Sequence, residues 1–403
     1  MLFGHEADFT GEDSGRVKIM KVLIVPMAAM AETAGPSLRC HLLAEGFIDA
    51  GFEVATCMAE DMNYKAMEGI SNYYLDVPMP FGLPKAIASR TFPVAGKLGI
   101  TSNKTVHSFD EVLWFTGNLD YRYLKKSTES IRKAIRAFHP DIVYSEFNVS
   151  AIIAAKKEGI TLCVTVSYPT RHEYAHRTRL ADGLNRLLGE LQLPSVASAL
   201  QLFDWADMSF CPSIRELEPI EKPNVTYCGP LKPVKQVPSP TSDRNKILVY
   251  VGNGTISASK ALKVIRNAFS EWDYEVFFAS ASLKEGTLGN VHIARRWDFD
   301  SLLNESVLFI NHGGQNSVMD GLLHGVPQIL IPGKVFERRY NARCIEENKA
   351  GVVIEHQAFD PERLRTIAER TIYSKEMTDN AVDLGNKLRK AGGIKTVIRK
   401  IAE

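Results

Sequence analysis

The chain has 403 residues, of which 45% are hydrophobic and 24% charged, and 48 Lys and Arg against 47 Asp and Glu leave a formal charge of +1. This length exceeds what one hydrophobic core supports, so we expect two domains. The balanced charge argues against nucleic acid as the main partner, and no run of about 18 uninterrupted apolar residues is present to span a membrane.

The N-terminal segment and the cysteines both indicate the setting of the protein. Residues 1–19 are polar and lack the apolar segment of a signal peptide, so we expect a flexible extension. The six cysteines are scattered, and no two of them make a Cys-x-x-Cys motif. Neither a metal clip nor a disulfide framework is expected, and a reducing cytoplasm is the simplest location.

Residues 20–235 alternate short apolar runs with amphipathic stretches. The run from Met20 to Pro26 precedes an amphipathic stretch, Leu38 to Ala50, and then FEVAT; the run DIVYS precedes the helical SAIIAAKKEG and then TLCVTVS. Apolar strands that alternate with helices are typical of a parallel sheet covered on both faces. Residues 62–118 interrupt this rhythm with aromatics, prolines and glycines, and irregular insertions of this kind often carry binding surfaces.

The alternation restarts at Lys246, after a segment rich in Pro, Ser and charges that predicts an interdomain linker. The strands expected in residues 245–385 are KILVYV, YEVFFAS, VHIAR, VLFIN, PQILIP and GVVI. The predicted fold class is therefore α/β, with two doubly wound Rossmann-like domains that face a central cleft, where ligands bind at the carboxyl ends of the strands. A final helix in residues 386–403 is in a position to pack back on the first domain.

A glycine turn, His312-Gly313-Gly314, follows the strand that ends at Asn311. Two glycines let the backbone approach a ligand closely, and the free N–H groups of a helix that starts near Asn316 or Ser317 attract anions. His312 is placed to donate a hydrogen bond to a diphosphate. Taken alone, the turn is equally consistent with a helix capped by Asn316.

The longer string around this turn resembles the donor-binding signature of family 1 glycosyltransferases, which include UDP-glucuronosyl-, UDP-glucosyl- and bacterial macrolide-type enzymes. The matching residues are spread over about 30 positions: His312, Gly314, Asn316, Ser317, Gly325-Val326-Pro327, Pro332, Glu337 and Asn341-Ala342. CGPL before the linker and VYVGNGT after it also resemble the family. The resemblance implies a GT-B fold, with a nucleotide sugar on the C-terminal domain and the acceptor on the N-terminal domain.

The resemblance implies a role for each matched position. The residues that would contact the donor diphosphate are His312, Gly313, Gly314, Asn316 and Ser317. Asp320 stands where the family has a Glu that binds the ribose, and Glu337 where an acid binds hydroxyls of the sugar. Arg338 replaces the usual Gln; its permanent charge favours a modified or anionic sugar, unless it serves only as an ion-pair partner of a nearby acid.

Three further segments are candidates for donor contacts. Trp297 lies one position late relative to the family's base-stacking Trp, so stacking on the base and a buried packing role both stay open. Gly254 and Thr255 follow the first strand of the second domain and can offer N–H groups and a hydroxyl to phosphates. Arg39, at the start of the first helix, can face a donor phosphate or an acidic acceptor. No metal is expected, because the family's site uses helix N–H groups and side chains.

The general base is the open question. Family members carry a His in the first strand–helix turn, where the alignment puts Pro36, and Pro has no titratable group. The family's partner acid corresponds to Glu146, which is the preferred candidate for the base, with a helix-capping role as the alternative. The other candidates are histidines: His41, which is also explained as a helix-face residue, His172 and His176.

The expected activity is inverting transfer of a sugar from a UDP- or dTDP-sugar, as co-substrate without a further cofactor, to a small hydrophobic acceptor such as a natural product. The expected acceptor contacts are aromatic: Tyr73, Tyr74, Phe81, Phe92, Trp114 and Phe115. Two alternatives stay open: a sugar-nucleotide epimerase or hydrolase on the same fold, and a donor-binding accessory protein without turnover. Product analysis separates the three.

Overall fold

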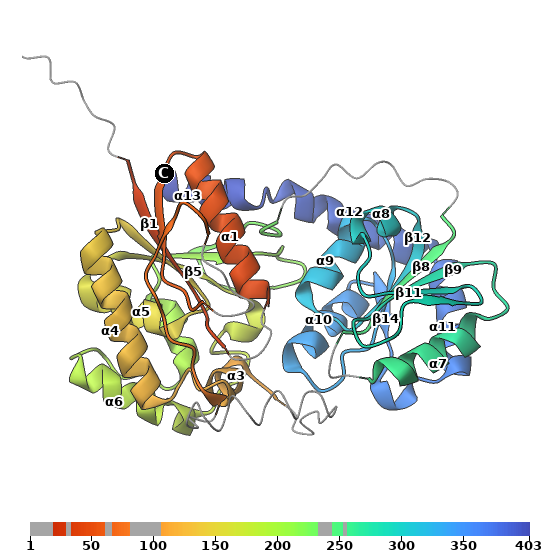
Figure 1. The fold of residues 1–403 in the computed structure, drawn as a ribbon, viewed down its shortest axis with the longest axis horizontal. Helices are drawn as coiled ribbons and strands as arrows, with labels where there is room; N and C mark the ends of the chain where they lie inside the picture. Colours follow the sequence, from red (N-terminus) through yellow and green to blue (C-terminus); the bar gives the residue numbers. More distant parts are fainter. Residues whose placement is uncertain (1–18, 30–33, 61–66, 81–105, 233–243, 253–255) are drawn as a thin grey trace, which may run out of the picture.

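The computed structural model describes residues 19–29, 34–60, 67–80, 106–232, 244–252 and 256–403. Two lobes lie side by side, one built mainly from each half of the chain (Figure 1). Each lobe contains a seven-stranded sheet. The expected flexible extension falls on residues 1–18, and most of the expected linker on residues 233–243, which lie outside the described residues.

The first sheet has the order β3-β2-β1-β4-β5-β6-β7, and its strand pairs are parallel. Its strands are β1 (Lys21–Pro26), β2 (Glu53–Thr56), β3 (Ser71–Asn72), β4 (Ile142–Glu146), β5 (Thr161–Thr165), β6 (Met208–Cys211) and β7 (Val225–Tyr227). The strand order reverses between β1 and β4. A crevice for ligands is expected outside the carboxyl ends of these two strands.

Helices cover both faces of the first sheet. Helix α1 (Ala34–Asp49) lies on one face; the other carries α3 (Phe109–Phe115), α4 (Tyr121–Phe138), α5 (Val149–Glu158), α6 (Asp182–Glu190) and the 3-10 helices η2 (Tyr168–Thr170), η3 (Thr178–Ala181) and η4 (Ala199–Trp205). The period of two along β1 explains this arrangement. Val22 and Ile24 join the core under α1, whereas Leu23 and Val25 join the core under α4 and α5.

The second sheet has the order β10-β11-β9-β8-β12-β13-β14, and only its edge strand β10 is antiparallel to its neighbour. Its strands are β8 (Lys246–Tyr250), β9 (Glu275–Ala279), β10 (Gly286–Leu288), β11 (Val291–Ala294), β12 (Ser306–Asn311), β13 (Gln328–Leu330) and β14 (Gly351–Val353). The order reverses between β8 and β12, and the prediction of two doubly wound domains is confirmed.

The helices of the second domain also form two layers. One face carries α7 (Ala258–Phe269) and α11 (Pro361–Ile372), and the other carries α8 (Phe299–Asn304), α9 (Gln315–Leu323), α10 (Phe336–Glu347) and α12 (Lys375–Lys390), with η5 (His356–Ala358) after β14. Helix α9 begins at Gln315, one or two residues earlier than expected, and its N-cap is Gly314 rather than Asn316.

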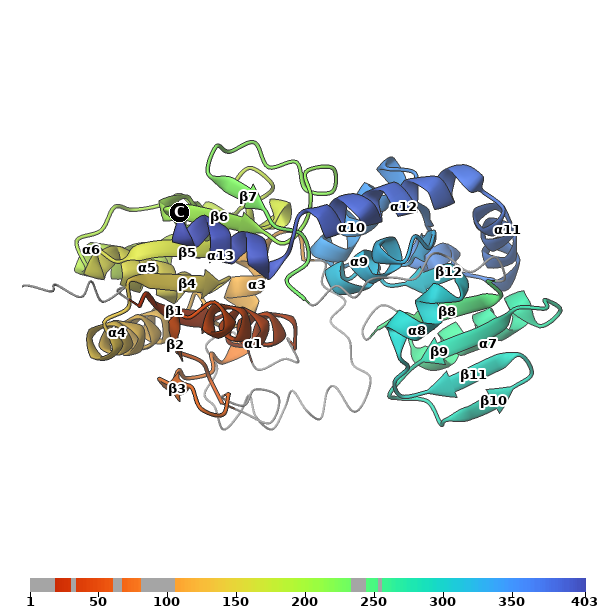
Figure 2. The ribbon, with the colours of Figure 1, turned by 90° about the horizontal axis from the view of Figure 1, so that it is seen from above.

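The C-terminal helices connect the two domains. Helix α12 packs on α9, and α13 (Ile394–Ala402) returns to the first domain beside α1 (Figure 2). Val397 and Ile401 are buried in the same core as Phe47. Gly46 of α1 allows this close contact, because a Cβ there would clash with Ile394. The expected helix over 386–403 is thus divided: the part that packs on the first domain begins only at Ile394.

Candidate functional site

The predicted donor site lies at the point where the second sheet reverses its strand order. Strand β12 ends at Asn311, whose side chain is fully buried. Its Oδ1 accepts a hydrogen bond from the Gly313 amide at 2.8 Å, and its Nδ2 donates to Oε1 of Gln328 at 2.8 Å. Asn311 therefore fixes the shape of the glycine turn that precedes α9, a helix whose first amides have no partner within the helix.

Glycines on both sides hold the His312 ring. A Cβ at Gly314 would lie 2.6 Å from Nε2 of His312, and a Cβ at Gly252 would lie 3.1 Å from its ring. Gly252 also has a φ of +61°, which favours glycine. These two positions explain physically why glycine follows both β8 and β12. The predicted phosphate ligands Gly254 and Thr255 lie outside the described residues.

His312 is neutral in the free protein. Its Nδ1 lies 3.3 Å from the carbonyl oxygen of Tyr250, which only accepts, so Nδ1 carries the proton and Nε2 is an acceptor. Burial, and then the charge of Arg338, lowers the pKa of His312 to about 4, against a smaller opposing effect of the Tyr250 carbonyl. The hydrogen bond from His312 to a diphosphate that the sequence suggests therefore requires a second proton on the ring.

Binding of UDP or dTDP is accordingly expected to be accompanied by proton uptake at His312. An anion beside Nε2 raises the pKa of the ring from about 4, so affinity should fall as the pH rises above this value. Calorimetry in buffers of different ionisation enthalpy measures the uptake. His312→Asn is the control, since the nucleotide's own protonation remains in it; equal uptake by both proteins would contradict the assignment.

The other predicted diphosphate ligands follow at the start of α9. The capping residue Gly314 offers no side chain to the helix, so the first amides have no side-chain partner from the cap. Asn316 is exposed, whereas Ser317 is 6% exposed. The turn and this helix start together present N–H donors and a positive helix end in the place where the sequence predicts an anion.

Helix α10 adds two charged residues to the same site. Nδ2 of Asn341 donates to the Gly313 carbonyl at 3.0 Å and ties this helix to the glycine turn. Desolvation by the surrounding protein raises the pKa of Glu337, although its side chain is accessible to solvent. The positive charges of Arg39 and Arg338 oppose this shift. Because Arg39 belongs to the first domain, its charge acts on Glu337 from the other domain. Arg338 is half-buried, and burial lowers its pKa.

Two predicted donor contacts meet partners within the protein. Oδ1 of Asp320 is ion-paired with Nζ of Lys232, at the end of the first domain, so a ribose would have to compete with this lysine. Nε1 of Trp297 donates to the Phe278 carbonyl at 3.2 Å, and its ring meets Phe277 edge-on at 5.1 Å. Trp297 thus has a packing role, and only its solvent-accessible part is available to a base.

Glu146, the preferred candidate for the base, is ion-paired with Arg39, which lies one turn after Pro36 in α1. Glu146 ends β4 and is fully buried; its Oε1 accepts from Nε of Arg39 at 2.5 Å, and its Oε2 accepts from Oγ1 of Thr165. Arg39 therefore pairs with Glu146. The cap of α5 is Asn148, whose side chain accepts from the Ala151 amide, so the capping alternative for Glu146 is wrong.

The candidate histidines lie on other elements. His41 is partly buried one turn further along α1 than Pro36. His172 and His176 stack on each other at 3.9 Å, and Nδ1 of His172 lies 3.0 Å from Oγ of Ser198. Burial, and next the charge of His176, lowers the pKa of His172. Neither of the stacked histidines has a hydrogen bond to Glu146 or Arg39 among those found in the described residues.

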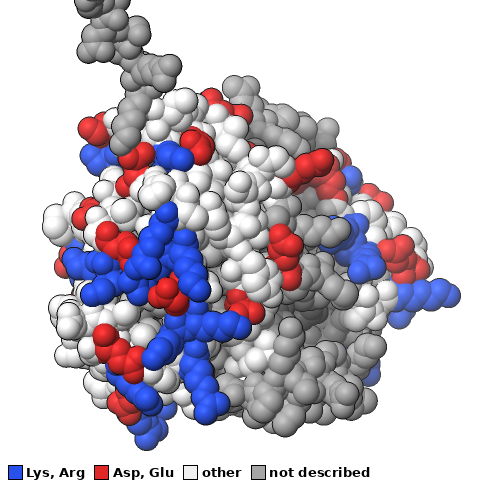
Figure 3. Space-filling view, turned by 60° about the vertical axis from the view of Figure 1, so that its left-hand side comes forward, with Lys and Arg blue, Asp and Glu red and all other residues white. Residues whose placement is uncertain are grey.

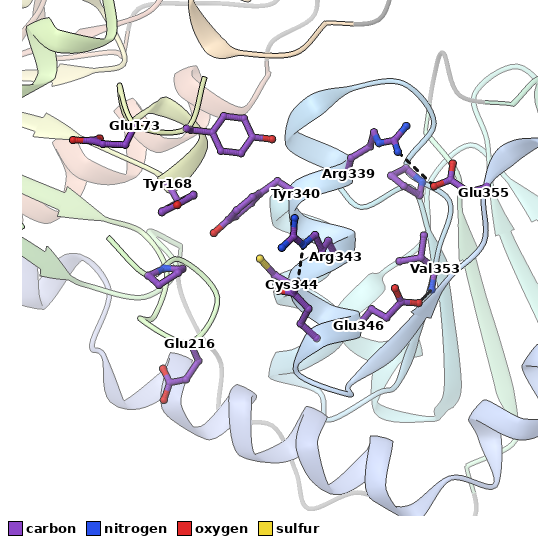
Figure 4. A pocket seen from close by; sticks show the side chains of 14 residues that line it. Tyr168, Glu173, Glu216, Arg339, Tyr340, Arg343, Cys344, Glu346, Val353 and Glu355 are labelled. Carbon is purple, nitrogen blue, oxygen red and sulfur yellow. Dashed lines mark hydrogen bonds and ion pairs between the residues drawn. The ribbon is translucent and has the colours of Figure 1, made fainter. Parts of the chain in front are cut away.

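A hollow lies beside α10, between the two domains (Figure 4). Its volume is about 660 Å³. Tyr168 of the first domain stacks on Tyr340 of α10 at 5.3 Å, and Tyr174 contacts Tyr340 edge-on at 5.8 Å. Three of its charged residues are already paired with one another or with a main-chain group: Arg339 with Glu355, and Glu346 with the Val353 amide. The walls of the hollow thus combine an aromatic contact between the domains with charged residues that already have partners.

The aromatic residues expected to meet an acceptor are divided. Tyr73 packs on Phe138 in the core, whereas Tyr74 and Trp114 are 57% and 39% exposed. Phe115 contacts Trp114 at 5.3 Å. Phe81 and Phe92 lie outside the described residues. Among the described residues, exposed aromatic surface therefore exists in the first domain at Tyr74 and Trp114.

Glu218 is a buried acid at the domain boundary that sequence reasoning missed. It is 4% exposed, and its Oε1 accepts from Nε2 of Gln315, the first residue of α9, at 3.2 Å. Burial raises its pKa to about 7, with the Tyr168 amide opposing and the charge of Glu337 reinforcing the shift. Its partner is 97 positions away in the sequence, so no local pattern signals the contact.

Charge elsewhere does not indicate another site. Figure 3 shows Lys and Arg gathered on the outer side of the first domain. Helix α4 carries the basic residues Arg122, Lys125, Lys126, Arg132, Lys133 and Arg136. Several of these are neutralised by acids, as in the pairs Lys125–Glu190 and Arg136–Glu158. Among the described residues, no three His, Cys, Asp or Glu side chains form a metal site, and no helix is long and apolar enough to cross a membrane.

Comparison with protein families and curated proteins points to the second domain. Residues 265–401 match the family model of the erythromycin biosynthesis protein CIII-like C-terminal domain. UDP-glucuronosyltransferase 3A2 of Homo sapiens is 30% identical over 188 residues, which cover 40% of this chain and 34% of that protein. Demethyllactenocin mycarosyltransferase of Streptomyces fradiae is 28% identical over 153 residues, 36% of this chain and 33% of that one. The matches thus span about a third of these relatives.

Comparison with solved structures covers both domains. The calicheamicin glycosyltransferase CalG4 superposes with a TM-score of 0.70 at 16% identity, over 96% of this chain and 98% of that chain. The spinosyn rhamnosyltransferase SpnG, complexed with spinosyn aglycone, gives a TM-score of 0.69 at 14% identity, over 95% and 100% of the two chains. These likenesses confirm the predicted GT-B fold.

Proposed function

We propose that this chain, which belongs to the family 1 glycosyltransferases by its C-terminal domain and has their GT-B fold, transfers a sugar from a UDP- or dTDP-sugar to a small hydrophobic acceptor with inversion. The observation that supports this most strongly is the open start of α9. A turn shaped by Asn311 and a helix capped only by glycine lie in the second domain, and the acid Glu146 ends β4 in the first domain. A diphosphate fits the helix start; an acceptor hydroxyl reaches Glu146 only when the pair with Arg39 opens, because both oxygens of Glu146 are bound within the protein.

The proposed reaction is a single displacement. The acceptor oxygen attacks the anomeric carbon, the bond from that carbon to the β-phosphate oxygen breaks, and the proton of the hydroxyl passes to Glu146. The diphosphate leaves with the bonding electrons, and its charge is stabilised by the amides of α9 and by protonated His312. No cofactor other than the nucleotide sugar takes part in this scheme.

The donor is proposed from both the site and the neighbours. SpnG has been solved in complex with thymidine diphosphate, and this supports dTDP beside UDP as the nucleotide. Arg338 stands on α10 next to Glu337, where the sequence places the sugar. A guanidinium there favours a sugar with an anionic substituent, since a bidentate pair with a carboxylate gains more than a contact with a hydroxyl.

A thermal-shift screen with UDP, dTDP, GDP and their sugars tests the proposal. A nucleotide that binds should stabilise the protein by about 2.7 kcal/mol at a concentration about 100 times its Kd. UDP-glucuronic acid is expected to stabilise more than UDP-glucose. Turnover assays with the hits should then give a glycoside; a changed sugar on an intact nucleotide would instead identify an epimerase. If no nucleotide stabilises the protein, the donor site is wrong.

A further inference from the structure

We propose that Glu218 is a positioning residue of the donor site: it joins the start of α9 to the acceptor-side loop at Tyr168 and thereby fixes the glycine turn relative to the first domain. This inference rests on the proposed function, because it takes the start of α9 as the diphosphate site. Glu218 is buried and contacts the start of α9 through Gln315, so it is not expected to touch the substrate.

The two oxygens of Glu218 bind different domains. Oε2 accepts from the amide of Tyr168 at 2.6 Å, on the loop that follows β5 of the first domain. Oε1 accepts from Nε2 of Gln315 at 3.2 Å, at the start of α9 in the second domain. One buried carboxylate thus bridges the first domain and the second. Its negative charge makes each of these hydrogen bonds stronger than a bond to a neutral oxygen would be.

The segment around Glu218 is itself fixed to both domains. Ile214 and Leu217 are buried in the second domain's core with α9, α10 and α12. The hydroxyl of Tyr340 donates to the Leu217 carbonyl at 3.0 Å, and the hydroxyl of Tyr227 in β7 donates to the Glu218 carbonyl at 2.6 Å. These contacts hold the backbone of Glu218 in place, so its carboxylate can set the position of the Gln315 side chain.

The ionisation of Glu218 should control this bridge. Both partners are N–H donors, so only the carboxylate accepts from both, and protonation turns one oxygen into a donor that faces a donor. Its pKa of about 7 puts the change near neutral pH. The ionisable groups that face it are Glu337 of α10, Tyr340 and Cys344 of α10, Cys211 of β6 and Cys228.

Four variants test the bridge through the affinity for UDP or dTDP, measured by calorimetry. Gln315→Leu removes the contact from α9, and Glu218→Leu removes it from the other side; each should weaken binding about tenfold, the worth of a charge-assisted hydrogen bond. The double variant should bind no more weakly than Glu218→Leu alone, because Glu218→Leu already removes the bond to Gln315 together with the bond to the Tyr168 amide. Glu216→Leu is the matched control on the same segment: its exposed carboxylate pairs with Lys387, and affinity should stay within about twofold.

The conservative variant Glu218→Gln separates positioning from bulk structure. Like the protonated acid, the new amide places an N–H donor against the Gln315 amide, so affinity should fall below that of the wild type above pH 7 and match it below pH 7. The difference in pH dependence between wild type and Glu218→Gln should then show a single group that titrates near pH 7. If Glu218→Leu and Gln315→Leu match Glu216→Leu, or if their effects add, the proposal is overturned.

Failure of the proposed function gives a different result. If the wild type binds none of the nucleotides, the donor site is wrong whatever the variants do. The double-mutant cycle between Glu218 and Gln315 is then read from thermal unfolding instead: a coupling between the two shows that the bridge exists without a nucleotide role, and additive effects overturn the bridge as well.

Discussion

Replacement of Gly313 by Ala is expected to lower kcat/KM for the sugar donor by at least about a hundredfold, since a displacement of about 1 Å at a reacting site costs on this order. Gly313 has a φ of +78°, and a Cβ there would lie 2.7 Å from the carbonyl oxygen of Arg338. The added Cβ would press the main chain of the glycine turn against the main chain of α10. Either the glycine turn or the first turn of α10 must move, and both carry predicted donor contacts.

Gly289→Ala is the matched control for this experiment. Gly289 also has a left-handed backbone, with φ +67°, but a Cβ there meets nothing within 4 Å. Both substitutions should cost about 1 kcal/mol of stability from the backbone alone. Only Gly313→Ala should also lose activity and nucleotide affinity. Equal kinetics for the two variants would show that the glycine turn does not shape the donor site.

Glu146→Gln is expected to lower kcat by about 10²- to 10⁴-fold while the affinity for the nucleotide stays within about twofold, since general-base catalysis contributes on this scale. The structure adds a complication that the sequence does not show. Arg39 is 14% exposed and pairs with Glu146, so the substitution also leaves a guanidinium without its partner. A loss of about 3 kcal/mol in stability is expected beside the loss of turnover.

The double variant Arg39→Met with Glu146→Gln separates the two effects. Removal of both charges should restore much of the stability, which thermal unfolding measures, because no uncompensated charge remains in the interior. Turnover should stay low if the carboxylate accepts the proton. Recovery of turnover in the double variant, or unchanged kcat in Glu146→Gln, would limit Glu146 to a structural role and return attention to the histidines.

The first-domain part of the site combines a proline, Pro36, with an ion pair between Arg39 and Glu146. The proline stands where the family has its histidine and fits the first turn of a helix, where its missing N–H costs nothing. One turn later, Arg39 reaches the acid that would otherwise orient the histidine. The acid is thus paired with a permanent cation through Nε of Arg39, and a contact of Arg39 with a donor phosphate or an acidic acceptor stays a prediction.

The alternation of apolar runs with amphipathic stretches was sufficient to predict the two sheets. Buried parallel strands need continuous apolar residues, and this requirement is local, so β1, β4, β8 and β12 can be located from the sequence. The start of α9 was placed within two residues for the same reason. The short strands at the edges, such as β3 and β7, carry too few residues to leave a pattern.

The sequence by itself determined the fold class and the glycine turn at His312, because strand burial and left-handed backbone are requirements of neighbouring residues. Only the tertiary structure decided which partners the charged residues bind. Arg39 and Glu146 are 107 positions apart, and Glu218 and Gln315 are 97 apart. The protonation of His312 likewise depends on burial and on the Tyr250 carbonyl from another strand. Charge pairing and proton affinity are set by the three-dimensional surroundings, which no run of adjacent residues specifies.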